Sequence, residues 1–105
     1  MEVKELQKRM VEFMNRWDKA RNSPSTTDAR FIHLVEEVGE LARQYVNQKS
    51  RPGQYDEAEI KNAIGDITLQ LVKIADIHGF DMEELILEVL RDDEPRLREE
   101  EKNSR

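Results

Sequence analysis

Apolar residues recur at three- and four-residue steps along most of the chain, and this spacing predicts amphipathic helices. Four helices are expected, over residues 2–21, 28–48, 56–78 and 82–91. A turn cluster at 22–27 separates the first two, Pro52 and Gly53 mark the loop before the third, and Gly79 ends the third. Strand-like alternation is scarce, so the pattern predicts an all-α domain.

Each of the first three predicted helices carries an apolar stripe that needs a partner to cover it. The predicted buried stripes are Val3, Leu6, Met10, Phe13 and Trp17 in the first helix, Phe31, Leu34, Val38, Leu41 and Tyr45 in the second, and Ile60, Ile64, Ile67, Leu71 and Ile74 in the third. Asp81 and Glu84 match a capping box at the start of the fourth helix. Pro95 and the charged residues that follow it predict a tail. We therefore expect a helical domain over residues 1–91 and a charged, flexible tail over 92–105.

The composition predicts a thin core. The chain has 105 residues, of which 38% are charged and 37% are hydrophobic, so most helix faces should be in contact with water. Short helical chains of this kind often gain stability by oligomerising. A single unit would also leave the stripes of the second and third helices partly uncovered. We predict an antiparallel four-helix bundle completed by another copy of the chain, as a dimer or a tetramer.

The charge and the residue types that are missing exclude several classes of protein. A net charge of -6 argues against a nucleic-acid polymer as a partner, because such binding needs a basic face. The absence of cysteine excludes disulfides and thiolate zinc sites. No apolar run approaches the length of a membrane span, and the first residues lack a signal-peptide core. The sequence predicts a cytoplasmic protein that does not bind a membrane.

Three carboxylates, Glu36, Glu37 and Glu40, lie within five residues of an otherwise apolar helix. The nearest base in the sequence is Arg43, so the carboxylates repel one another unless a cation neutralises them. Glu37 and Glu40 share a helix face, and Asp66 lies on the next, antiparallel helix. Mg²⁺ is commonly held by a few carboxylates together with substrate phosphates, which makes it the natural candidate. A solvated acidic face is the common alternative.

The stretch Ile32-His33-Leu34-Val35-Glu36-Glu37-Val38-Gly39-Glu40-Leu41-Ala42 resembles the signature helix of the MazG-like all-α nucleoside triphosphate pyrophosphohydrolases. The stretches 64–71 and 79–81 are similar to the second metal helix of that family and the turn after it. The resemblance implies a MazG-like bundle that hydrolyses a nucleoside or deoxynucleoside triphosphate to the monophosphate and pyrophosphate. It also implies Mg²⁺ as the cofactor, or Mn²⁺ in its place.

The family pattern places Glu-x-x-Glu on one helix and Glu-x-x-Asp on the next. By position, Glu37, Glu40 and Asp66 match three of these four acids and are the implied metal ligands. Glu36 is adjacent to them, and the resemblance implies that Glu36 orients or deprotonates the attacking water. The implied catalytic residues are therefore Glu36 and Glu37.

The chain departs from the pattern at Ala63, where the family has glutamate. Asn62, one turn before Asp66, is the nearest substitute metal ligand, and an ordinary surface amide is the alternative. The lost acid leaves open a catalytically weakened or inactive module that binds nucleotides or assembles with itself. A further alternative is a plain helical oligomerisation domain with an acidic surface.

Three more residues are candidates for substrate contact. His33 lies one turn before Glu37, Lys73 lies on the polar stripe of the third helix, and Trp17 could stack on a base. Each has an alternative without a function: a partly buried histidine, a surface lysine along its helix, and a tryptophan packed in the core.

Overall fold

The computed structural model describes residues 1–23 and 26–104, and these residues form α-helices and one short 3₁₀ turn, without a strand. The elements are α1 (Val3–Ala20), α2 (Thr27–Ser50), η1 (Pro52–Gln54), α3 (Glu57–Ile77) and α4 (Met82–Asn103). The all-α prediction is confirmed for the described residues. Pro24 and Ser25 of the predicted turn, and Arg105 of the predicted tail, lie outside them.

Local side-chain caps explain where three of the helices begin. The side chain of Thr26 accepts a hydrogen bond from the Ala29 N–H (3.1 Å) at the start of α2. Asp56 caps α3, and Asp81 caps α4 as the predicted capping residue. At the end of α3, Gly79 has a φ of 73°, which a glycine adopts without strain. These caps place the starts of α2, α3 and α4 within one residue of those expected from the sequence.

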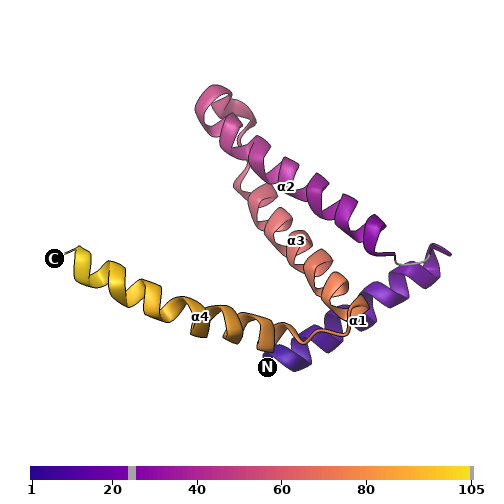
Figure 1. Cartoon of the computed structure of the whole chain (residues 1–105). Coiled ribbons are helices and arrows are strands. Elements are labelled where there is room, and N and C mark those ends of the chain that lie inside the picture. The colour runs from indigo at the N-terminus through magenta and orange to yellow at the C-terminus, as the bar shows by residue number, and fades with distance from the viewer. Residues whose placement is uncertain (24–25, 105) are drawn as a thin grey trace.

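Helices α2 and α3 form an antiparallel pair that packs along most of its length, and α1 lies across α3 (Figure 1). Helix α4 leaves this group and projects to one side, in contact with α1 near its own start. The buried apolar side chains of the described residues are few: Met14, Ala63, Val72 and Ala75. The thin core predicted from composition is confirmed. No helix of the described chain is long and apolar enough to span a membrane.

The buried face of α2 differs from the prediction. Phe31, Val38 and Tyr45 are 57%, 48% and 52% exposed, so the prediction that they are buried was wrong for the single chain. The face toward α3 instead carries half-buried Leu34, Glu37 and Leu41 and buried Gln44 and Asn47. The physical reason is that α2 has two apolar stripes, and α3 covers one of them. The uncovered stripe, named here the outer stripe, consists of Phe31, Val35, Val38, Ala42 and Tyr45.

Predicted core positions on α1 and α3 are also exposed. The exposed positions on α1 and α3 that were expected to be buried are Val3, Leu6, Phe13, Trp17, Ile64 and Leu71. The few contacts between helices in one copy of the chain leave these side chains largely open to solvent.

Helix α4 extends further than predicted. It does not end at Arg91 but continues through Pro95 to Asn103, so the predicted tail is helical over most of its length. Proline removes one helical hydrogen bond, while Glu94 and Arg98 form an i,i+4 ion pair (3.1 Å) that spans it. No residue of α4 is buried, and the apolar side chains of its first half face solvent.

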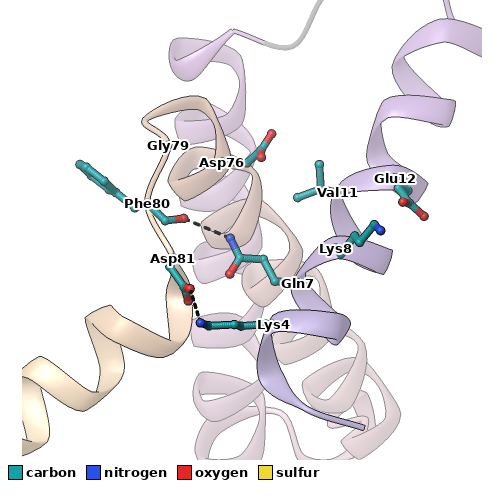
Figure 2. Close-up of a pocket in the computed structure, with 9 residues that line it drawn as sticks. All are labelled: Lys4, Gln7, Lys8, Val11, Glu12, Asp76, Gly79, Phe80 and Asp81. Atoms are coloured by element: carbon teal, nitrogen blue, oxygen red, sulfur yellow. Dashed lines mark hydrogen bonds and ion pairs between the residues drawn. The ribbon is translucent and has the colours of Figure 1, made fainter.

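Gln7 connects α1 to the start of α4 through two hydrogen bonds. Its amide nitrogen donates a hydrogen bond to the Phe80 carbonyl (3.1 Å), and its amide oxygen accepts one from the Met82 N–H (2.9 Å). Lys4 adds an ion pair with Asp81 (3.6 Å), and Figure 2 shows how these α1 side chains reach the α3–α4 turn. The direction of α4 is therefore set by polar contacts at one end.

Candidate functional site

The packing of α2 on α3 brings Glu37 and Asp66 to the same cavity, although they are 29 positions apart in the sequence. Glu37 lies on the covered face of α2, between Leu34 and Leu41, and is half-buried. Its Oε2 atom is shielded from solvent and has no hydrogen-bond partner among the described residues. A shielded carboxylate oxygen without a donor is costly, so this atom is a candidate for binding a cation.

The electrostatic environment of Glu37 also favours a bound cation. Burial raises the pKa of Glu37, and the negative charges of Glu40, Asp66 and Glu36 raise that pKa further. The deprotonated form of Glu37 is therefore destabilised by its surroundings. A divalent cation would reverse this effect, because it attracts all four carboxylates.

The described residues contain no group of three or more histidine, cysteine, aspartate or glutamate side chains arranged around one point as a metal site requires. The nearest substitute ligand, Asn62, donates its amide N–H to Asp66 Oδ2 (3.4 Å), which leaves its carbonyl oxygen as the possible ligand. Ala63 is 2% exposed, so the position where the resembling family has an acid is enclosed by the structure. Carboxylate and amide oxygens are the donor types that Mg²⁺ prefers, and of the implied acids Glu37 and Asp66 line the same cavity.

The cavity that holds Glu37 and Asp66 has a volume of about 500 Å³, within the range of small-molecule sites. Three helices line it. The lining comprises Phe13, Met14, Trp17, Asp18 and Arg21 from α1 and its C-cap, Arg30 and Glu37 from α2, and Asp66, Leu69 and Gln70 from α3. It combines aromatic, cationic and acidic side chains, which are the groups that a nucleotide's base and phosphates need.

This cavity also holds an ion pair that the sequence pattern does not predict. Arg30 donates to Asp18 Oδ1 (2.6 Å), and both side chains are 15% exposed. Arg30 also donates to Gln70 Oε1 (3.4 Å), so the three residues link α1, α2 and α3. Asp18 Oδ2 is shielded and has no partner among the described residues. No periodicity connects these positions, because they lie on three different helices, so the sequence does not predict the pair.

The structure separates the three predicted substrate contacts. Trp17 lines the cavity, with the Arg21 guanidinium 4.3 Å from its ring centre. The His33 side chain is 56% exposed and pairs loosely with Glu36 (4.0 Å), outside the cavity lining. Lys73 is 5% exposed and does not line the cavity.

Lys73 lies between α1 and α3. Its ammonium donates a hydrogen bond to Asn15 and forms an ion pair with Asp76 (3.6 Å). These contacts favour a role in holding α1 against α3.

A second cavity of about 540 Å³ lies between α1 and the end of α3 with the turn that follows it (Figure 2). Lys4, Lys8, Asp76 and Asp81 are among its lining residues. It lacks both the acidic cluster and the tryptophan, so the first cavity is the better candidate site.

The fold and the cavity define a class: an all-α protein with a carboxylate-containing cavity between antiparallel helices. The family model of the MazG nucleotide pyrophosphohydrolase domain matches residues 25–100. The match covers well over half of the chain, and the chain therefore belongs to this family, which confirms the resemblance. No curated protein and no solved structure matches the chain. The matched region holds the acidic cluster and Asp66, while α1, with Trp17 and Asp18, lies before it.

Proposed function

We propose that the protein is a Mg²⁺-dependent nucleotide pyrophosphohydrolase that converts a nucleoside or deoxynucleoside triphosphate to the monophosphate and pyrophosphate. Family membership supports the reaction class. The observation that carries the proposal is Glu37. Its shielded oxygen lacks a partner among the described residues, and burial, followed by three neighbouring acids, raises its pKa. The proposal includes a cytoplasmic location, where such substrates are abundant.

Glu37, Glu40 and Asp66 would hold the metal, with the Asn62 carbonyl as a further ligand. When bound, a divalent ion would neutralise phosphate charge and withdraw electrons from the phosphorus that is attacked. Mn²⁺ has similar ligand preferences and is expected to substitute for Mg²⁺. The raised pKa of Glu37 means that its carboxylate gains more from a cation than an exposed carboxylate would.

Glu36 is proposed to orient or deprotonate the attacking water. It is exposed and lies beside Glu37 in the sequence, with His33 one turn away as its partner. Trp17 would stack on the base at the α1 side of the cavity.

We also propose that copies of the chain pair as a dimer or tetramer. The outer stripe of α2 has the 4-3-4-3 spacing of a helix–helix seam, and its members are exposed in the single chain. A second copy of the chain carries the same apolar stripe, so the stripes of two copies can cover each other. Size-exclusion chromatography with light scattering measures this directly, and a monomer at micromolar concentration would refute it.

The enzymatic proposal is tested by pyrophosphate release. The purified full chain is incubated with each common nucleoside and deoxynucleoside triphosphate and Mg²⁺ or Mn²⁺, with EDTA as the control. Metal-dependent formation of pyrophosphate and monophosphate is expected, and Glu37→Gln should abolish it. A folded protein that hydrolyses none of these nucleotides refutes the proposal.

Two observations favour a second candidate, a module that binds nucleotides with weak or no hydrolysis. Ala63 replaces an expected acid, and the described residues hold no three-carboxylate metal group. Isothermal titration with nucleotide and Mg²⁺ separates the two candidates. Binding without pyrophosphate release supports the module, whereas turnover at rates ordinary for an enzyme excludes it.

A further inference from the structure

We propose that, when two copies of the chain pair, helix α4 of each copy docks on helix α1 of the other. This docking rests on the proposed pairing through the outer stripe of α2, and it goes beyond that pairing because it assigns two other surfaces. It does not depend on the nucleotide reaction. The occupant of both surfaces is a second copy of this chain.

The first surface is an uncovered apolar face in the first half of α4. Its members are 37% to 61% exposed and border a shallow hollow of about 270 Å³: Leu85, Ile86, Val89 and Leu90. Within its own chain, α4 contacts α1 near its start and then projects away, so the described residues leave this face open (Figure 1). Apolar patches of this kind mark interaction surfaces.

The second surface is the outward apolar face of α1. Phe13 and Trp17 are each 48% exposed, lie edge to face with ring centres 6.4 Å apart, and border a groove of about 750 Å³. Val3 and Leu6 continue this face toward the start of the helix and are also exposed. Aromatic residues are enriched at protein–protein interfaces. Helices of 18 and 22 residues are about 27 and 33 Å long, so α1 and α4 can pack along most of their length.

The charges of the two surfaces are complementary. Residues 82–94 of α4 carry six acids and one base, whereas α1 carries five bases and three acids. The helical period of 3.6 residues places Asp92 and Asp93 beside the apolar face of α4, and Arg9 and Arg16 along one edge of the apolar face of α1. Opposite charges that border an interface fix which surfaces meet. A contact between two α4 helices would instead bring acids against acids, so α1 is the favoured partner of α4.

Two copies can exchange their α4 helices symmetrically, because each copy carries both surfaces. The pairing of the α2 stripes brings the α4 helix of one copy close to the α1 helix of the other, so docking becomes an intramolecular step at high effective concentration. Docking is therefore expected to strengthen a pair that α2 has formed, rather than to form a pair by itself.

Reversed charges test the docking on the full chain. Arg9→Glu with Arg16→Glu reverses the α1 edge, and Asp92→Lys with Asp93→Lys reverses the α4 edge. Each variant alone should raise the Kd of the pair at least tenfold, about 1.4 kcal/mol, because like charges then oppose one another. The matched control is Glu84→Lys with Glu88→Lys, which changes the charge by the same amount on the opposite side of α4 and should leave the Kd near wild type.

An equimolar mixture of the two reversed variants should recover wild-type affinity. In the mixed pair, the reversed α1 meets the reversed α4 and the two unchanged surfaces meet each other, so both contacts are attractive again. A mixture of the arginine variant with the control variant keeps one repulsive contact and should bind more weakly. Sedimentation equilibrium over a dilution series measures each Kd, and circular dichroism checks that every variant remains helical.

Trp17 gives a second readout, because it is the single tryptophan of the chain and lies on the α1 surface. Docking should cover its exposed side, so its emission should move to shorter wavelength as the wild-type chain pairs. At concentrations where the reversed variants still pair, this shift should be absent from each variant alone and present in their mixture.

Three results would overturn the docking. A monomeric wild-type chain refutes both the pairing and the docking. A wild-type pair that the reversed charges weaken no more than the control does refutes the docking and leaves the pairing through α2. Two helical variants whose mixture recovers neither affinity nor the fluorescence shift also refute it. Pyrophosphate release is measured separately, so the enzymatic proposal stands or fails independently of these results.

Discussion

Replacing Glu37 with glutamine should stabilise the metal-free protein. The substitution keeps the size of the side chain and removes a charge that burial and three neighbouring acids destabilise. The shielded Oε2 is replaced by an amide, whose N–H₂ can donate to the carboxylates around it. An unpaired buried polar atom costs about 1–3 kcal/mol, and we expect about 1 kcal/mol here because the residue as a whole is half-buried. In a domain of this size that gain raises Tm by about 4–8 °C.

The pH dependence gives a second measure of the same effect. The raised pKa means that folded Glu37 binds its proton more tightly than unfolded Glu37 does. Its contribution is therefore most favourable in acid, below the ordinary glutamate pKa of about 4.3, and is lost as the pH rises through the raised value. Metal-free wild-type protein should lose stability over this interval, and Glu37→Gln should lose less.

Thermal unfolding in EDTA, at pH 4 and at pH 7, tests both statements. Glu88→Gln is the control, because Glu88 is an exposed acid on α4. Added Mg²⁺ at 100 times its Kd should stabilise the wild-type chain by about 2.7 kcal/mol and the Glu37→Gln variant by much less. A variant that is no more stable than wild type in EDTA at pH 7 would refute the electrostatic reasoning. An equal response to Mg²⁺ would remove Glu37 from the metal site.

Three further predictions concern other parts of the molecule. Ala63→Glu places a carboxylate at a position that is 2% exposed, so it should destabilise the metal-free chain by about 1–3 kcal/mol, whereas Mg²⁺ should recover that loss and raise pyrophosphate release. Melting curves with and without Mg²⁺ measure this, and a loss that Mg²⁺ does not change would contradict it. Val38→Glu puts a charge in the outer stripe and should shift the light-scattering mass to the monomer, while an unchanged mass would exclude this stripe from the interface. Lys73→Met should lower the unfolding free energy by about 1 kcal/mol, since Asn15 loses a donor, and should leave nucleotide turnover near wild type. A large rise in KM would instead favour a contact between Lys73 and substrate.

Sequence spacing predicted that acids of α2 and α3 lie near one another, and Glu37 and Asp66 line the same cavity. Glu37 and Glu40 share a face by the period of the helix, and Asp66 follows from the antiparallel pairing of two neighbouring helices. The polar half could not be predicted. Asp18, Arg30 and Gln70 lie on three helices, and only the crossing of α1 over the α2–α3 pair brings them together.

The sequence by itself determined the helices and their starts, because caps and hydrophobic spacing act within a few residues. It also determined the family, because the acids of the signature helix and Asp66 keep their order. Only the tertiary structure decided which of the two stripes on α2 is covered. Both stripes have the same period, and the docking of α3 covers Leu34 and Leu41 and leaves Phe31 and Tyr45 exposed. The tertiary structure also decided the direction of α4. This helix contacts α1 near its start, and those contacts set its direction, whereas its own hydrophobic pattern does not.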